Sequence, residues 1–300
     1  MFDTEALRTF IAVHRQKGFS GAARALHRTQ PAISTRIRLL EQDLGVRLFE
    51  RTAGGIMLSQ AGRVLLPRAE AIVAALGDAE QAVRGLRKEA AGPIDLVIVG
   101  TLADTNLTGV LKLFAKRHPG VELNLRTARS MEVSELVRNG ETTIGLRYDR
   151  DRSENLQYEQ IGSDPMVIAC APAHRFAGKL MRSLKPLKGE RWLAFPEIPG
   201  KREISASHIW TIFLALGLGE ISWWPVDSLN AQKRLVEAGS GLALLPKSSL
   251  QEELSSGSLK IIRVAGLQVG QSVQMVSRKN GFFSAATIKL MELLRAQYRT

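Results

Sequence analysis

The first forty-five residues alternate apolar and polar side chains with the three- and four-residue spacing of amphipathic helices. This spacing predicts one helix that begins near Asp3 and ends at Gly18, and a second, short helix that Ser20 caps. A third helix is expected over 30–44, because proline is tolerated in a first helical turn and Gly45 follows the last apolar residue. The pattern therefore predicts a small helical domain at the start of the chain.

The third predicted helix turns polar side chains away from its apolar side. Its apolar positions are Ile33, Ile37, Leu40 and Leu44. Hydroxyl, amide and guanidinium groups near the start of a helix suit the major groove of DNA, where they reach bases and phosphates. The candidate DNA contacts are Gln30, Pro31, Ser34, Thr35, Arg36 and Arg38. On spacing alone, an ordinary three-helix bundle with a solvated polar face remains an alternative.

Two short β-prone runs follow the third helix, over 46–51 and 56–59, and the turn between them includes Gly54 and Gly55. Such runs predict a β-hairpin, which beside a recognition helix is called a wing. We expect Arg51 to face phosphates or a narrow minor groove, where a guanidinium meets enhanced negative potential.

Five segments of this region carry a family resemblance. They are FSGAARAL at 19–26, TQPAIS at 29–34, IRLLE at 37–41, LGVRLFER at 44–51 and LSQAG at 58–62. Together they resemble the N-terminal signature of the LysR-type transcriptional regulators. Thr35, and the absence of side chains at Gly54 and Gly55 in the tip of the wing, depart from the pattern of that family. These departures do not change the expected fold, but they alter the expected operator sequence.

One long helix is predicted over 60–88, and its apolar residues repeat in alternating four- and three-residue steps. They are Leu65, Ala69, Ile72, Leu76, Ala79, Val83 and Leu86. A seam of about three heptads predicts pairing with a second helix, and hence a two-fold dimer that presents two recognition helices. Packing of the helix on its own domain is the alternative. The resemblance implies that this helix is the dimerisation linker and that the full assembly is a tetramer.

The remaining two hundred residues have the pattern of an α/β domain, in which β-branched runs alternate with helical segments after a break at 90–93. The predicted strands are 94–99, 121–126, 143–147, 166–170, 192–195, 221–226, 241–245 and 271–277. The predicted helices are 106–117, 131–139, 204–216, 229–238 and 284–298. This alternation implies a mostly parallel sheet.

The expected fold class is therefore α/β, with a winged helix-turn-helix and a long linker helix before it. The expected domains are a DNA-binding domain over 1–59, a dimerisation linker over 60–90 and an effector-binding domain over 91–300. The resemblance implies two lobes similar to periplasmic binding proteins, joined by two crossovers with a ligand cleft between them. One lobe would contain 94–164 and 269–300, and the other 165–268.

Ligands of open α/β sheets bind beyond the carboxyl ends of strands, where helix N-termini offer unpaired N–H groups. The positions that this rule selects are Thr101, Ala103, Arg129, Ser130 and Arg147 in the first lobe, and Phe195, Arg202 and Ser228 in the second. Arg147 pairs either with an acidic effector or, in an ordinary salt bridge, with Asp149 or Asp104. The four tryptophans, Trp192, Trp210, Trp223 and Trp224, either line an aromatic pocket or belong to the core of the second lobe.

Charge and composition narrow the class of protein. The formal net charge of +12 favours an anionic partner, with nucleic acid the first candidate. The single cysteine, Cys170, excludes an intrachain disulfide and a thiolate zinc cluster, and the five histidines lack metal-ligand spacing. No Gly-rich phosphate loop is present. We therefore expect no enzyme, metal or cofactor, and the absence of a signal peptide or membrane span predicts a cytoplasmic protein.

These features together predict a sequence-specific transcriptional regulator. Its partners would be double-stranded DNA, a small anionic effector such as a carboxylate, further copies of the chain, and RNA polymerase as an additional candidate. The effector would act by favouring one arrangement of the lobes over another. A solute-binding or transferase-like two-lobed protein and a ligand-independent DNA-binding protein are the alternatives.

Overall fold

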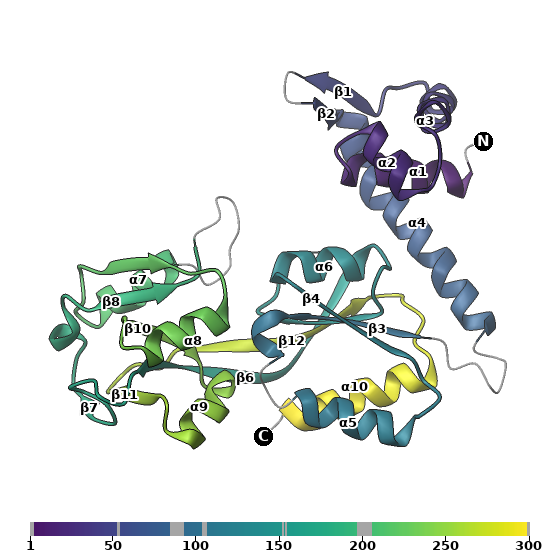
Figure 1. Ribbon diagram of the computed structural model, residues 1–300. Helices are drawn as coiled ribbons and strands as arrows, with labels where there is room; N and C mark the ends of the chain where they lie inside the picture. The colour runs from purple at the N-terminus through teal and green to yellow at the C-terminus, as the bar shows by residue number, and fades with distance from the viewer. Residues whose placement is uncertain are drawn as a thin grey trace.

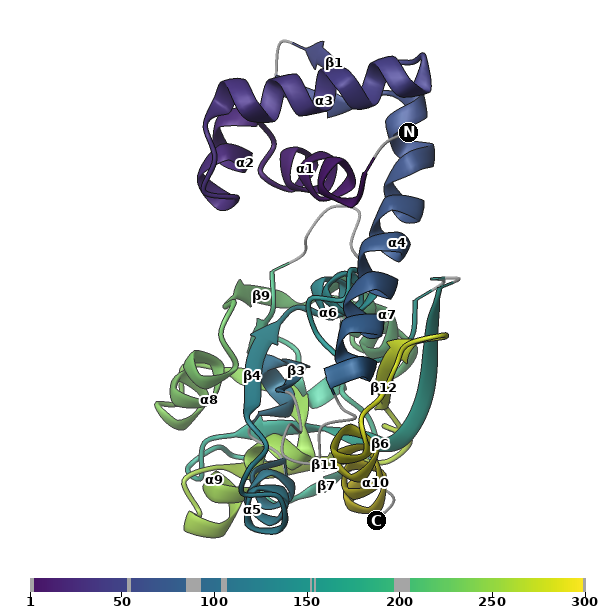
Figure 2. The ribbon, with the colours of Figure 1, turned by 90° about the vertical axis from the view of Figure 1, so that its right-hand side faces the viewer.

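The computed structural model describes residues 3–52, 55–84, 93–103, 107–151, 153, 155–196 and 206–298. Figure 1 and Figure 2 show three parts in chain order: a small N-terminal domain, one long helix, and an α/β domain with two lobes. The long helix carries the N-terminal domain above the first lobe, so that the recognition elements lie at the outer end of the molecule.

The N-terminal domain contains the helices and the hairpin that the apolar pattern predicts. Its elements are α1 (Thr4–Arg15), α2 (Phe19–Ala25), α3 (Gln30–Leu44), β1 (Phe49–Thr52) and β2 (Gly55–Leu58). Asp3 caps α1 by accepting from the backbone N–H of Ala6 at 2.6 Å, and Thr29 caps α3. The cap predicted for α2 was wrong, because Ser20 lies inside that helix, whose N-cap residue is Gly18 without a side-chain cap. Gly45 ends α3 with a left-handed φ of 68°, which glycine adopts without strain.

One buried core joins these short elements. Phe10, Ile37 and Leu40 are buried in it, together with Phe49 from the hairpin. Glu41 at the end of α3 accepts the backbone N–H of Leu48 at 2.7 Å, which fixes the hairpin beside the helix. The orientation of the hairpin relative to α3 is therefore set by a hydrogen bond as well as by packing.

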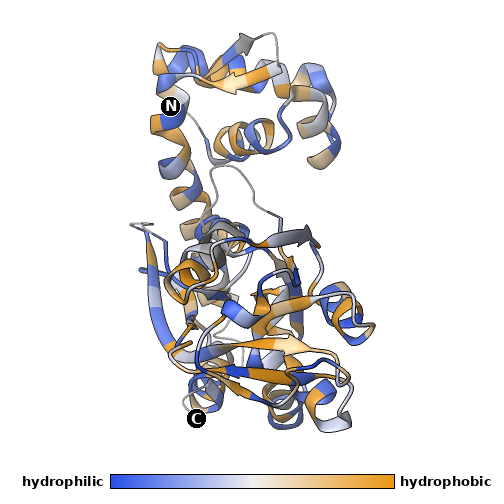
Figure 3. Ribbon diagram, turned by 90° about the vertical axis from the view of Figure 1, so that its left-hand side faces the viewer, coloured by the Kyte–Doolittle hydropathy of each residue, from blue (hydrophilic) through white to orange (hydrophobic). Residues whose placement is uncertain are grey.

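The long helix α4 (Gln60–Arg84) divides the expected seam into two parts. Ala69 is buried in the core of the N-terminal domain, and Leu65 packs against it. Ile72, Leu76 and Val83 lie beyond that domain and are 48%, 38% and 68% exposed. Figure 3 shows apolar residues recurring along this helix. The seam was therefore predicted too long, because its first positions serve the helix's own domain; Leu86 lies outside the described residues.

The first lobe is a sheet covered by helices on both faces. Its elements are β3 (Ile94–Val99), α5 (Leu107–Arg117), β4 (Leu123–Ala128), α6 (Ser130–Arg138), β5 (Ile144–Tyr148) and α10 (Ala285–Tyr298), with a 3₁₀ turn at Gly100–Leu102. The strands β4, β3 and β5 are parallel neighbours. Helices α5 and α10 pack on one face, and α6 packs on the other.

The second lobe has the same layered plan. Its strands are β7 (Leu180–Met181), β8 (Arg191–Ala194), β9 (Ser222–Pro225), β10 (Leu242–Pro246) and β11 (Lys260–Val264). Its helices are α7 (Ala206–Ala215), α8 (Leu229–Glu237) and α9 (Gln251–Ser256), with 3₁₀ turns at Lys185–Leu187 and Lys247–Leu250. Helix α7 packs on one face of the sheet, and α8 and α9 pack on the other.

Two long antiparallel strands, β6 (Leu156–Cys170) and β12 (Gly270–Arg278), connect the lobes. The first part of β6 pairs with β12, and its last five residues pair with β10 and β11 of the second lobe. The sequence pattern predicted a strand only from Met166, because the preceding residues are largely polar. The ladder with β12 overrides their low β-propensity. The pattern also missed β7, α9 and β11.

Candidate functional site

Helix α3 lies on the outside of the N-terminal domain (Figure 2), and its polar side is exposed. All six candidate contacts on this helix, Gln30, Pro31, Ser34, Thr35, Arg36 and Arg38, are exposed. Successive helical residues are turned by about 100°, so Thr35 and Arg38 point away from the buried face while Arg36 lies nearer its edge. The Arg36 guanidinium is accordingly 3.7 Å from the carboxylate of Glu5 on α1.

The hairpin stands beside α3, as expected for a wing (Figure 2). Arg51 lies in β1 opposite Ile56, but its side chain is outside the described part of the structure. The turn residues Ala53 and Gly54 also lie outside it. The DNA contact proposed for Arg51 therefore stays a prediction.

A cavity of about 580 Å³ lies between the two lobes. Eight residues were selected from the sequence because they stand at strand ends or helix starts. Seven of them line this cavity: Thr101, Ala103, Arg129, Ser130, Arg147, Phe195 and Ser228. Arg202 lies outside the described residues. The rule works because the carboxyl ends of parallel strands meet at one edge of each sheet, and the two edges face each other across the cleft.

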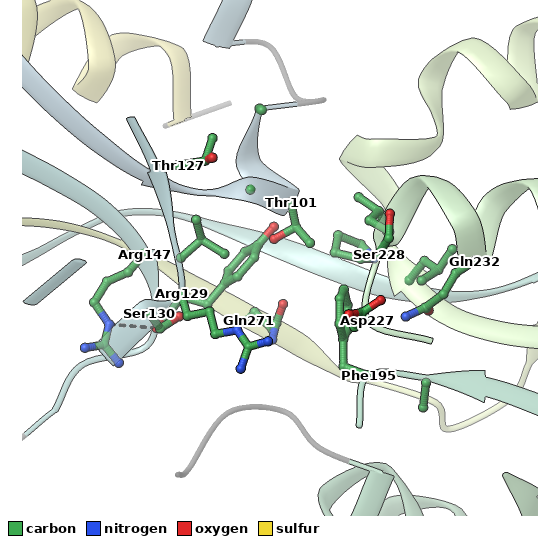
Figure 4. Close-up of a pocket in the computed structure, with 18 of the residues that line it drawn as sticks. Thr101, Thr127, Arg129, Ser130, Arg147, Phe195, Asp227, Ser228, Gln232 and Gln271 are labelled. Carbon is green, nitrogen blue, oxygen red and sulfur yellow. Dashed lines mark hydrogen bonds between the residues drawn. The ribbon is translucent and has the colours of Figure 1, made fainter. Parts of the chain in front are cut away.

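Two helix N-termini border the cavity from opposite sides. Arg129 is the N-cap residue of α6, and Ser228 is the N-cap residue of α8. The Arg129 side chain is exposed, and it makes no ion pair with any described residue. Figure 4 shows Arg129 from the first lobe and Ser228 from the second on the two sides of the pocket. Both helix ends direct partial positive charge at the space between them.

Arg147 is held by the protein itself. Its guanidinium lies 2.7 Å from Asp151, donates to Ser134 Oγ at 2.6 Å and is almost fully buried. Asp149, one of the two partners expected from the sequence, instead accepts from the hydroxyl of Ser272 at 2.9 Å. That expected salt bridge is therefore wrong in its partner, and the other candidate, Asp104, lies outside the described residues.

A partly buried network of hydrogen bonds holds the Arg147 guanidinium in place. The hydroxyl of Tyr158 donates to Asp151 at 2.6 Å and lies 3.1 Å from Ser134. Burial raises the pKa of Tyr158 to about 12, and the hydrogen bond to Asp151 acts in the same direction. Burial also favours a higher pKa for Asp151, but hydrogen bonds from Tyr158 and Ser134 outweigh it and the net pKa is lowered. Arg147 therefore faces an ionised carboxylate.

Several polar residues of the cavity were missed by sequence reasoning. They are Thr127, Glu132, Tyr148, Asp149, Asp227, Asn230, Gln232 and Gln271. Most of them, including Thr127, Tyr148 and Asp227, stand within two residues of selected positions, so a wider window around each strand end would have included them. Gln271 had no such signal, because it enters the cavity only through the pairing of the crossover strands.

One hydrogen-bonded group spans the two lobes at the crossover. Asp164 in β6 is buried, and it accepts from the hydroxyl of Tyr148 at 3.2 Å and from the backbone N–H of Ser248 at 3.2 Å. The hydroxyl of Ser248 also donates to Asp164. Burial raises the pKa of Tyr148, and the neighbouring Asp164 charge raises it further. The strand that joins the lobes is thus tied to both of them.

The tryptophans do not form an aromatic pocket in the described structure. Trp192 is fully buried in the second lobe, where it packs edge-on against Phe213. Trp223 and Trp224 are half-buried, and neither lines the cavity. The guanidinium of Arg191 covers the ring of Trp224 at 5.2 Å. The side chain of Trp210 is outside the described part of the chain.

Comparison with known proteins identifies the fold and its two parts. The family described as "Bacterial regulatory helix-turn-helix protein, lysR family" matches residues 4–63, and the family described as "LysR substrate binding domain" matches residues 87–299. The chain belongs to the LysR family. Among the curated relatives of this LysR-type regulator is the transcriptional regulator CbbR of Rhodospirillum rubrum. It is 31% identical over 294 residues, which cover 98% of this chain and 96% of that one.

Solved structures show the same fold over the whole chain. Full-length OxyR from Pseudomonas aeruginosa matches with a TM-score of 0.71 and 17% identity, over 100% of this chain and 95% of that one. Full-length CbnR in complex with its target DNA matches with a TM-score of 0.62 and 24% identity, over 99% of this chain and 100% of that one.

Family membership confirms three expectations: the LysR resemblance, the winged helix-turn-helix with a two-lobed α/β domain, and the function of a DNA-binding transcriptional regulator with an effector-binding domain. It excludes a solute-binding or transferase-like protein as the identity of the whole chain, because that alternative leaves the helix-turn-helix domain unexplained. Among the described residues, no helix has the length and hydropathy needed to cross a membrane.

Proposed function

We propose that this LysR-type regulator binds DNA as a homodimer and that a small anionic metabolite in the cavity between the lobes controls it. The proposal assigns DNA binding to residues 1–59, pairing to the linker over 60–90 and effector binding to 91–300. Within the last part, it assigns one lobe to 94–164 with 269–300 and the other to 165–268. The continuity of β6 and the return of β12 support this division.

The exposed side of α3 is the surface proposed for the major groove. Thr35 and Arg38 point outward from it, and a guanidinium pairs bidentately with guanine. The net charge of +12 supports an anionic partner, as does the likeness to CbnR, which was solved in complex with its target DNA. We propose that Arg51 contacts phosphates or the minor groove from the wing.

The exposed apolar residues of α4 are proposed as the dimer contact. Ile72, Leu76 and Val83 are large, exposed and spaced so that they share one side of the helix. A second copy of α4 presents the same residues, so the contact closes with two-fold symmetry. A tetramer formed from two such dimers is a further proposal, which rests on the family resemblance.

The anionic effector is proposed because Arg129 is a cation in the cavity wall without an ion-pair partner in the described structure. It stands at the N-terminus of α6, where the helix dipole adds to its attraction for a carboxylate or phosphate. Glu132, Asp149 and Asp227 also line the cavity and disfavour further negative groups. We therefore infer an effector with one acidic group near Arg129 and hydroxyl or amino groups toward Asp227.

Binding assays with small acids test this proposal. Short mono- and dicarboxylates, hydroxy acids, amino acids and sugar phosphates are the probes, and calorimetry or thermal shift measures their affinity for the full chain. We expect Arg129→Ala to lower the affinity of any acid that binds by about tenfold or more, and Arg129→Lys to retain part of it. The control is Arg117→Ala, an exposed arginine on α5 outside the cavity. Unchanged affinity in Arg129→Ala would reject the proposed anion site.

The cellular setting follows from the DNA partner. A regulator that binds the bacterial chromosome works where the chromosome lies, so we propose that the chain acts in the cytoplasm. We also propose that it acts by binding and not by catalysis, since the family consists of transcriptional regulators. RNA polymerase is a proposed further partner at the promoter.

A further inference from the structure

Helix α6 reaches from the cavity to the linker helix. Its first residue, Ser130, lines the cavity together with the N-cap residue Arg129. Its nine residues span about 13 Å at 1.5 Å each, and the turn that follows contains Gly140. Gly140 has a left-handed φ of 72°, and a Cβ placed on it would lie 2.9 Å from the Cβ of Ala74 on α4. The far end of α6 therefore touches the backbone of the linker helix.

An arginine from the crossover strand fastens this contact. Arg278 of β12 pairs with Asp78 of α4, and both side chains are only 14% exposed. The other nitrogen of the same guanidinium donates to the carbonyl oxygens of Val137 and Thr142, at 3.0 and 3.5 Å. One side chain thus connects the linker helix, the end of α6 and a strand that joins the two lobes.

A second arginine connects the end of α6 to the N-terminal domain. Arg15, in the last turn of α1, lies 2.5 Å from Glu141 beside Gly140, and 3.8 Å from Glu70 on α4. Glu70 is 7% exposed, and burial raises its pKa. We call Arg15, Glu141, Asp78 and Arg278, with the Gly140–Ala74 contact, the clasp.

The middle of α6 is attached to the sheet. Ser134 accepts a hydrogen bond of 2.6 Å from Arg147 on β5, and Val133 and Val137 are fully buried against the strands. A short helix that is held in this way moves as one body, because packed side chains do not yield continuously. A displacement at its cavity end is therefore transmitted to its clasp end.

We propose that α6 is a lever that couples occupancy of the cavity to the orientation of the DNA-binding domain through the clasp. This inference rests on the proposed function, because it needs a ligand at Arg129 and DNA at α3. Arg15 and Glu141 are 34% and 36% exposed, and ion pairs that water reaches contribute little stability, so the role of this pair is to select one orientation and not to hold the fold together. The largely buried Arg278–Asp78 pair keeps α4 attached to the first lobe. Coupling between two sites is reciprocal, so DNA binding at α3 must alter the cavity end of α6.

Charge-swap variants of the full chain test the lever by hydrogen–deuterium exchange. We expect Glu141→Arg or Arg15→Glu alone to raise exchange about fivefold at residues 12–16 and also at 130–134, which lie at opposite ends of the coupled elements. The double variant Arg15→Glu with Glu141→Arg is built on a Glu70→Gln background, which removes the carboxylate 3.8 Å from position 15. It restores the pair with reversed charges, and exchange at both segments returns toward that of the wild type. Lys289→Glu, which breaks an exposed pair with Glu292 on α10, is the control and leaves both segments unchanged.

The second measurement adds a DNA duplex selected from random sequence by the wild-type protein. DNA should change exchange at 130–134 in the wild type and in the double variant, but not in either single variant. Wild-type-like exchange at 130–134 in both single variants, or a double variant no better than the singles, would overturn the lever. If the wild type binds no duplex, the proposed function fails instead, and exchange in the free protein still decides whether the clasp and the cavity are coupled.

Discussion

The guanidinium of Arg147 lies 2.7 Å from the carboxylate of Asp151, four residues further along the chain. Between them Asp149 adopts a left-handed φ of 50° directly after the end of β5. An arginine at the end of a strand beside the cleft was an obvious candidate for an effector contact. Its ionic partner is instead supplied by the loop that follows it, and Arg129 is the cation without such a partner in the described structure.

Replacing Arg147 should destabilise the first lobe. Arg147→Met removes the partner of Asp151 and two hydrogen bonds, so we expect a loss of about 3 kcal/mol in the free energy of unfolding. Urea denaturation of the variant and the wild type measures this difference. Arg175→Met, which alters an exposed arginine of the second lobe, is the control. A variant as stable as the wild type that has lost its effector response would return Arg147 to the role of a ligand contact.

The stability supplied by Asp151 should depend on pH. The pKa of Asp151 is lower in the folded protein than in the unfolded chain, where it is near 4. Its contribution to the free energy of unfolding is therefore complete above about pH 4 and is lost as the pH falls through the pKa of the folded state. We expect Asp151→Asn to cost about 2 kcal/mol at pH 7, because the side chain is partly exposed, and progressively less below about pH 4. Unfolding curves between pH 3 and pH 7 measure the difference in the free energy of unfolding between the wild type and the variant. A difference that grows toward low pH would contradict the assignment of an ionised Asp151.

The two arginines of α3 should contribute unequally to operator binding. Arg38 is directed outward, whereas Arg36 is occupied by Glu5 at the edge of the helix. Arg38→Ala should weaken binding to a selected duplex about tenfold to a hundredfold, and Arg36→Ala should have the smaller effect. Gel-shift titrations at several salt concentrations separate base contacts from phosphate contacts. If neither substitution changes affinity, α3 is not the recognition helix.

A charge on the exposed side of α4 should separate the proposed dimer. Ile72→Glu or Val83→Glu places a carboxylate in an apolar two-fold contact, so the dissociation constant should rise about tenfold or more. Ile288→Glu, a matched change at an exposed isoleucine on α10, is the control. Sedimentation velocity over a concentration series measures the assembly. If the dissociation constant is unchanged in both α4 variants, the dimer contact lies on another surface.

The sequence was most informative where the evidence is local. Helix α3 begins and ends at the predicted residues because Thr29, Pro31 and Gly45 are capping signals within a turn of its ends. The family resemblance likewise rests on a contiguous stretch, and the family comparison confirms it. The cavity positions after β3 and β4 were also predictable, since parallel strands bring their carboxyl ends to one edge.

The sequence alone determined most of the helices and strands, the family and the edge of the sheet where a ligand would lie. Only the tertiary structure decided that Arg147 pairs with Asp151, that β6 runs unbroken through both lobes, and that Gln271 enters the cavity. The physical reason is the distance along the chain over which each effect acts. Periodicity and capping act within a few residues, whereas the partner of a charge or of a strand depends on how segments that are distant in the sequence pack together.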